Sequence, residues 1–172
     1  MNLKHFKSKS IQKYYQKEIL SQSNNIQFSA SKVKKIGFIV EDDQQKDQIV
    51  KLLKKELGLN ETQIHFLIYT EYVKGEEVDR YYFSENDFGW NAALKSNYVE
   101  DFIKKDFDLL INFSDIDNLY INLVVLLSKA KFKVGKPGID DALYQLMIAC
   151  DMTQIPTFVK ELKKYLHILN KL

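Results

Sequence analysis

The sequence has few of the residues that mark specialised chemistry. It contains one cysteine, Cys150, and two prolines in 172 residues. A single cysteine excludes a disulfide framework within the chain and fits a reducing compartment, so a cytoplasmic location is expected. His5, His65 and His167 are scattered, without the cysteine or carboxylate spacing of a zinc site. We therefore expect no bound metal.

Arginine and long apolar runs are also scarce. Arg80 is the single arginine, so 24 of the 25 basic residues are lysines. Sequence-specific DNA binding relies on arginine forks at base edges and is not expected. The longest apolar run, Leu119–Leu127, is too short for a membrane span and contains Asn122. No apolar segment follows the basic N-terminus, so no signal peptide is expected.

A glycine-rich phosphate-binding loop is missing as well. The first apolar strand is followed by Glu41, Asp42 and Asp43, where a dinucleotide-binding or P-loop protein has glycines. Three carboxylates repel a pyrophosphate, so we expect no nucleotide cofactor. Asp42 or Asp43 is expected to cap the next helix instead. Ser114 lacks a Gly-x-Ser-x-Gly elbow, and no residue is assigned a catalytic role.

What the sequence does contain is an alternation of apolar strands and helices. Its 45% hydrophobic and 13% aromatic content is typical of a globular protein. Strands are expected at residues 34–40, 64–69, 81–83, 108–113, 131–135 and 143–149, the last being strand or buried helix with strand favoured. Helices are expected at residues 2–22, before Gly58, at 97–105, at 119–130, and after Thr153 as a cap, with Pro156 in the first turn. This order predicts a three-layer α/β fold, Rossmann-like or flavodoxin-like, whose mainly parallel sheet has helices on both faces.

The N-terminus forms a basic leader. Residues 1–35 hold eight lysines and one glutamate, a net charge of +7 in a chain of net charge +2. We expect a basic amphipathic helix over residues 1–24 and a single domain over 25–172. The helix either packs on its own domain, which ranks first, or binds an anionic membrane or RNA. The candidate residues for an anionic partner are Lys4, Lys7, Lys9, Lys13, Tyr14, Tyr15 and Lys17.

Polar residues follow two of the expected strands. In parallel α/β sheets, ligands bind beyond the carboxyl ends of the strands, where the strand order reverses. The candidate binding residues there are Glu41, Asp42, Asp43, Asn112, Ser114, Asp115, Asp117 and Asn118. The simpler interpretation is that Asp117 or Asn118 caps the helix after residue 118. Trp90 is interpreted as a core anchor rather than an exposed recognition residue.

Three resemblances extend this interpretation. IGFIVEDDQQKDQIVKLLKKELG, with Lys136-Pro137, resembles a two-component receiver domain, whose paired acids hold Mg²⁺. DLLINF, the apolar helix and AKFKVG, within residues 107–136, resemble the N-terminal half of heptosyltransferase-like glycosyltransferases, which implies a Rossmann-like half-domain. The whole chain is similar to a family of small bacterial proteins of unknown function.

These observations favour a binding protein. We predict a non-enzymatic cytoplasmic binding or adaptor module for a protein or an anionic partner, either an RNA or ribonucleoprotein or a membrane surface. The alternative is a glycosyltransferase-like or Mg²⁺-dependent enzyme that uses the carboxylates at the strand ends.

Overall fold

The fold is built on one parallel sheet. A computed structural model of the chain describes residues 3–22, 31–71, 81–138, 140–151 and 153–172. The strands are β1 (Ile36–Val40), β2 (Ile64–Tyr69), β3 (Tyr82–Phe83), β4 (Leu109–Asn112), β5 (Lys133–Gly135) and β6 (Leu146–Met147). Their order is β3-β2-β1-β4-β5-β6, and every pair is parallel. This order is that of a Rossmann fold rather than a flavodoxin-like one.

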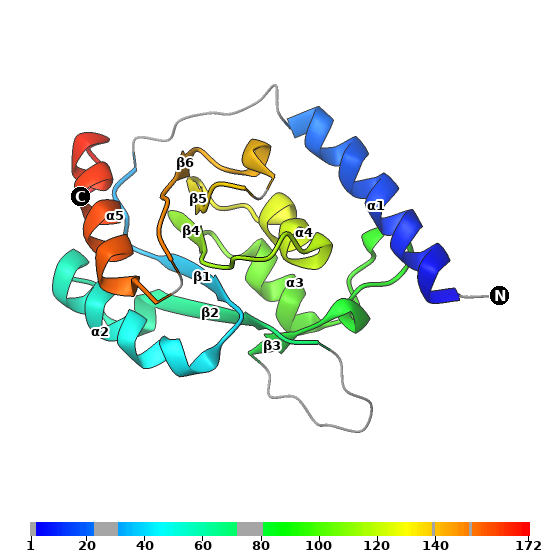
Figure 1. The fold of residues 1–172 in the computed structure, drawn as a ribbon, viewed down its shortest axis with the longest axis horizontal. Helices are drawn as coiled ribbons and strands as arrows, with labels where there is room; N and C mark the ends of the chain where they lie inside the picture. Colours follow the sequence, from blue (N-terminus) through cyan, green and yellow to red (C-terminus); the bar gives the residue numbers. More distant parts are fainter. Residues whose placement is uncertain (1–2, 23–30, 72–80, 139, 152) are drawn as a thin grey trace.

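Helices cover both faces of this sheet (Figure 1). They are α1 (Leu3–Gln22), α2 (Lys46–Leu57), α3 (Asn97–Lys104), α4 (Leu119–Leu127) and α5 (Ile155–Ile168). α2 and α5 pack on one face, while α3 and α4 pack on the other, with α1 outside α4. The predicted three-layer α/β architecture is confirmed. Among the described residues, no helix is long and apolar enough to cross a bilayer.

The sheet separates two apolar cores, and the central strands β1, β2 and β4 contribute to both of them. In β1, Phe38 and Val40 belong to the core shared with α2 and α5, and Ile39 belongs to the core shared with α3 and α4. All five residues of β1 are buried. A strand buried on both faces has to be apolar throughout, which is why the short continuous apolar runs of the sequence mark these strands.

Local sequence signals fix some element ends and mislead at others. Gly58 ends α2 with φ 70°, a left-handed conformation that glycine adopts without a Cβ clash. α4 ends at Leu127 rather than residue 130, because Ser128 is already extended as the chain turns towards β5. The prediction that Thr153 caps α5 is wrong, because the helix begins at Ile155 and its cap position is Gln154, which makes no side-chain capping bond.

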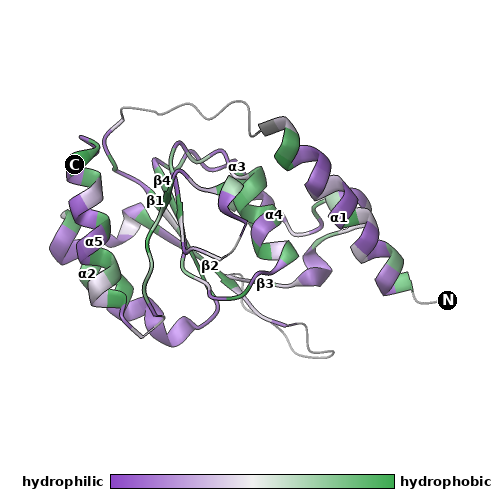
Figure 2. Cartoon of the chain, turned by 45° about the horizontal axis from the view of Figure 1, so that its top comes forward, coloured by the Kyte–Doolittle hydropathy of each residue, from purple (hydrophilic) through white to green (hydrophobic). Residues whose placement is uncertain are grey.

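α1 is docked onto the rest of the protein. It carries hydrophobic and hydrophilic residues along its whole length (Figure 2), and Ile11 and Tyr15 are buried against the core around α4. The amine of Lys7 donates to the carbonyls of Glu85 and Phe88 at 2.9 and 3.0 Å. The structure thus agrees with the first-ranked prediction, self-packing of this helix. The predicted boundary at residue 24 lies outside the described residues.

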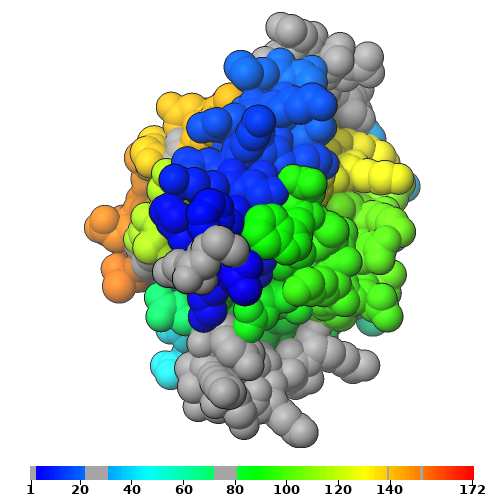
Figure 3. Space-filling model, turned by 90° about the vertical axis from the view of Figure 1, so that its right-hand side faces the viewer, coloured from blue at the N-terminus to red at the C-terminus, as the bar shows by residue number. Residues whose placement is uncertain are grey.

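Trp90 is not a core anchor. Its side chain is 52% exposed, and it begins the short 3-10 segment η4 (Trp90–Ala92). Asn91 and Ala92 both have positive φ, 51° and 59°. This sharp turn buries Phe88 and Ala92 and leaves the indole between them at the surface. η4 packs against α1, and the segment lies beside the N-terminal half of α1 (Figure 3).

Candidate functional site

The reversal of strand order lies between β1 and β4. β1 and β4 are paired neighbours, but the chain leaves β1 through α2 on one face and leaves β4 through α4 on the other. The loops after these two strands therefore start side by side at the carboxyl edge of the sheet. This is where a Rossmann-like sheet binds its ligands, and it is where the eight predicted edge residues lie.

The first group of edge residues forms a closed polar contact. A carboxylate oxygen of Glu41 accepts a hydrogen bond from the backbone N–H of Asp115 at 3.0 Å. Asp115 is ion-paired with Lys136, which follows β5 and is 5% exposed. The Lys136 amine also lies 5.2 Å from the centre of the Phe113 ring. The Glu41 hydrogen bond thus joins the ends of β1 and β4, and the buried Lys136 joins the ends of β4 and β5 with Asp115 as its counter-ion.

Asp42 and Asp43 have local roles. Asp42 accepts from the backbone N–H of Gln44 at 2.9 Å and so caps η1 (Asp43–Gln45), which leads into α2. Asp43 accepts from the phenol of Tyr82 at 2.5 Å. The predicted cap after β1 is confirmed at Asp42. Within the described part of the chain, these hydrogen bonds direct Asp42 and Asp43 to Gln44 and Tyr82 rather than to Asp115, so the acids of the two loops do not form one carboxylate pair.

A second group of edge residues lies on the face covered by α4. Asn112 is fully buried, and its amide donates to the phenol of Tyr144 at 2.7 Å. The Tyr144 ring lies against Gly135 of β5. Glycine makes room for it, because a Cβ at this position would come within 2.6 Å of the ring. The Asn112 Oδ1 and the hydroxyl of fully buried Ser114 have no hydrogen-bond partner among the described residues. Buried polar atoms without a hydrogen-bond partner are uncommon in folded proteins.

Asn118 and Asp117 bind different groups at the start of α4. Asn118 caps α4 by accepting from the backbone N–H groups of Tyr120 and Ile121 at 2.8 and 3.2 Å. The predicted cap is therefore confirmed at Asn118. Asp117 points elsewhere and accepts from the amide of Asn122, one turn into α4, at 2.7 Å.

Asp117 lines a pocket between the inner side of α1 and this edge. We call it the α1 pocket; it has a volume of about 590 Å³, and its walls are Gln12, Tyr15, Gln16, Ile19, Asp117, Leu119, Asn122, Gly138 and Asp140. The phenol of Tyr15 donates to Asp140 at 2.7 Å across the pocket. The Asn122 side chain is 4% exposed, and its Oδ1 has no partner among the described residues.

The electrostatics of the α1 pocket are negative. Burial raises the pKa of Tyr15, and its hydrogen bond to Asp140 and the nearby charge of Asp117 raise it further. Burial also raises the pKa of Tyr144 to about 12; its bond with Asn112 opposes this shift, and the charges of Asp140 and Asp117 add to it. A phenolate is disfavoured at both positions because the phenols are buried and because the carboxylates of Asp140 and Asp117 lie nearby. None of the lining residues is basic.

The predicted anionic-partner residues of α1 separate into two sets. Lys7 and Tyr15 are bound to the protein's own groups, as described above, and Tyr14 is half-buried against the α4 core. Because these three side chains pack against the protein itself, they do not form part of an outward-facing binding surface. The four remaining predicted residues are exposed: Lys4, Lys9, Lys13 and Lys17.

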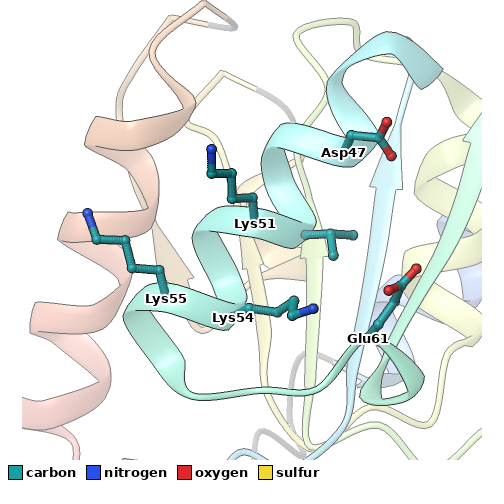
Figure 4. Close-up of a pocket in the computed structure, with 6 residues that line it drawn as sticks. Asp47, Lys51, Lys54, Lys55 and Glu61 are labelled. Atoms are coloured by element: carbon teal, nitrogen blue, oxygen red, sulfur yellow. The ribbon is translucent and has the colours of Figure 1, made fainter.

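A further hollow of about 560 Å³ runs along α2 (Figure 4). Its charged lining residues, Asp47, Lys51, Lys54, Lys55 and Glu61, are all exposed. Lys51 and Lys55 point away from Asp47 and Glu61 (Figure 4), so the charges do not converge on one ligand position. Among the described residues there is also no group of three or more side chains suited to hold a metal ion.

Sequence reasoning missed several residues of the α1 pocket. Asn122 lies inside an apolar helix, and Asp140 follows β5, far from the edge residues in sequence. Tyr15 is predicted only as a candidate for an anionic partner or for packing on the domain, not as part of a pocket. The one available signal was Asn122, a lone amide in the most apolar helix of the chain, because a buried amide there requires a partner.

The strand order and the polar edge define a Rossmann-like parallel α/β protein. Within that class, the chain belongs to a family of unknown function, DUF6913, whose model matches residues 7–169. The expected similarity to an uncharacterised family is thereby supported. No curated protein and no solved structure matches the chain. The glycosyltransferase and receiver resemblances gain no support from these comparisons.

Proposed function

We propose that this protein is a non-enzymatic binding module that attaches to an anionic lipid surface, on the cytoplasmic side of a membrane, through the exposed side of α1. The observation that carries the proposal is a stripe of lysines on this helix. Lys9, Lys13 and Lys17 follow one another at intervals of four residues, so they lie on one face. All three are exposed, and none forms an ion pair with another described residue.

The stripe faces away from the protein body. Helical spacing places Ile11 and Tyr15, which are buried, on the side opposite to Lys13. The residues around Lys13 form what we call the α1 outer face: Phe6, Lys9, Lys13, Lys17 and Leu20. Like charges four residues apart destabilise a helix by about 0.2–0.5 kcal/mol per pair. The stripe therefore does not serve the stability of α1, and an external anionic partner supplies its missing counter-charge.

Apolar groups next to the lysines favour lipid over RNA as this partner. Phe6 and Leu20 on the α1 outer face are 49% and 71% exposed, and Leu3 is 63% exposed. Trp90 belongs to a segment that contacts the N-terminal half of α1, since its neighbour Asn91 is hydrogen-bonded to Ser10. Lysines with apolar and tryptophan side chains suit the headgroup region of a bilayer. Single-stranded RNA gains affinity from lysines and stacking aromatics but nothing from exposed leucines.

The expected attachment is weak and reversible. Each lysine close to an anionic leaflet contributes about 1 kcal/mol, so the three stripe lysines contribute roughly 3 kcal/mol. Removing their charges should therefore weaken binding about a hundredfold. Because exposed charges are screened by salt, the attachment should also weaken as ionic strength rises.

Vesicle co-sedimentation tests this function. The full chain should pellet with phosphatidylserine-containing vesicles and not with phosphatidylcholine vesicles. The triple variant Lys9→Gln, Lys13→Gln, Lys17→Gln should lose this binding. The matched control is Lys51→Gln, Lys54→Gln, Lys55→Gln, which removes three exposed lysines from α2 (Figure 4) and should bind like the unmodified protein. Equal losses in both triple variants, or binding to RNA without binding to vesicles, would refute the proposal.

A further inference from the structure

We propose that a cavity between β2 and α3 binds a small oxyanion, either a tetrahedral one such as phosphate or the carboxylate of a small acid. We call this cavity the His65 pocket. Its volume is about 260 Å³, and its walls are His65, Tyr81, Tyr98, Asp101, Phe102 and Lys105. This volume lies below the range of about 300–1,000 Å³ for drug-sized ligands, so the ligand has to be small. The pocket shares no residue with the α1 outer face and is independent of the proposed function.

The Lys105 amine and the His65 ring supply hydrogen-bond donors to this pocket. The amine lies 3.3 Å from the Nδ1 of His65. An ammonium group only donates, so Nδ1 is the acceptor of this bond and the ring proton is on Nε2. The pair therefore retains ammonium protons and an imidazole N–H as donors. Among the described residues, Lys105 forms no ion pair, so its charge has no counter-ion there.

The preceding lysine provides an internal comparison. Lys104 is exposed and forms an ion pair with Glu100, four residues earlier in α3. Lys105 has Asp101 at the same spacing, but its amine is directed to His65 instead. Asp101 is exposed, whereas Lys105 and His65 are half-buried, so this carboxylate lies at the outer side of the pocket. The cation further inside is thus left for a ligand of opposite charge.

The inner part of the His65 pocket is positive and held in place by its neighbours. Burial lowers the pKa of His65, and the charges of Lys105 and Lys35 lower it further. The His65 ring lies 5.7 Å from the ring of Phe107, and the hydroxyl of Tyr98 donates to a backbone carbonyl of β2 at 2.9 Å. A bound anion would offset the repulsion between the positive charges without requiring these walls to move.

Other ligand classes fit this pocket less well. A cation would meet the charge of Lys105 at 3.3 Å from the imidazole. A divalent metal ion needs several protein ligands, and no group of three or more suitable side chains occurs among the described residues. A nucleotide is too large for about 260 Å³. Donors, positive charge and small size together select an oxyanion.

Proton NMR of the histidine side chains in the full chain tests this inference. The probes are sulfate, which stands for a tetrahedral oxyanion and keeps its charge over the pH range used, and acetate, which stands for a carboxylate. Both are titrated at constant ionic strength, and His65→Gln assigns the His65 signal. We expect one probe or both to shift this signal saturably and to raise the pKa of His65, while exposed His5 and His167 do not respond. The probe that binds more tightly identifies the class of oxyanion.

The variant Lys105→Gln removes the central charge of the pocket. It should weaken anion binding by about tenfold or more, because a hydrogen bond to a charged group contributes at least that much. The matched control is Lys104→Gln, which removes an exposed lysine that does not line the pocket and should leave the affinity unchanged. The melting temperature without anion establishes that each variant is folded.

Three results would overturn the inference. One is the absence of a saturable His65 shift with either probe at millimolar concentration in the unmodified protein. Another is an equal response of His5 or His167, which would show only a general attraction of anions to a basic protein. The third is an equal loss of affinity in Lys104→Gln and Lys105→Gln.

Discussion

Docking of α1 depends on Ile11. Shortening this side chain to alanine is the sharpest test of whether the helix is docked. Ile11 is 0% exposed and packs in the core around α4. Ile11→Ala removes three carbon atoms, worth about 0.8 kcal/mol each in lost burial, or roughly 2.4 kcal/mol. The cavity left behind adds to this cost, and the higher helix propensity of alanine returns about 0.4 kcal/mol. We expect the free energy of unfolding to fall by about 2–4 kcal/mol.

Urea unfolding measures this loss, followed in parallel by circular dichroism and by the fluorescence of Trp90, the single tryptophan. Trp90 adjoins α1, so its signal reports whether the helix separates before the rest of the domain unfolds. The control is Phe6→Ala on the α1 outer face, where the side chain is 49% exposed, and it should cost about 0.5 kcal/mol or less. If Ile11→Ala costs no more than Phe6→Ala, α1 is not docked in solution.

Two further predictions concern β5. Gly135→Ala should destabilise the protein by about 2–3 kcal/mol, because the new Cβ would lie 2.6 Å from the Tyr144 ring. Gly58→Ala, at φ 70° with nothing within 4 Å, should cost only about 1 kcal/mol; equal costs in denaturant titrations would contradict the packing argument. Burial lowers the pKa of Lys133 from its ordinary value of 10.5 to about 8. Between those pH values the unfolded chain holds a proton that the folded chain lacks, so stability should rise with pH, by at most about 1.4 kcal/mol per unit. Unfolding at pH 7.5, 8.5 and 9.5 should show this slope in the unmodified protein and not in Lys133→Met, and parallel profiles would refute it.

The fold was predictable because its signals are local. Each buried strand is a short apolar run, and glycine or a capping side chain bounds several of the helices. The cap at Asn118 follows from the polar residue just before the apolar helix. Trp90 was mispredicted because its exposure depends on two consecutive residues with positive φ, Asn91 and Ala92, and neither is a glycine that would have marked the turn.

The candidate site was only partly predictable for the opposite reason. Edge residues after β1 and β4 could be located from strand ends alone. The α1 pocket, however, brings together residues separated by more than a hundred positions, as the bond from Tyr15 to Asp140 shows. Helical spacing separates Lys7, which binds backbone carbonyls inward, from Lys13, which is exposed, but it does not predict which side of the helix is buried. Only the folded protein shows which side that is.

The measurement that tests the proposed function most directly is the fluorescence of Trp90 during titration with vesicles. This indole is the only one in the chain, is 52% exposed and lies in the segment η4, which packs against α1. Phosphatidylserine-containing vesicles should shift its emission to shorter wavelength as the indole enters the headgroup region. The shift should be lost at high salt and in the Lys9, Lys13 and Lys17 triple variant. Emission that stays unchanged with anionic vesicles at low salt would contradict lipid binding through α1.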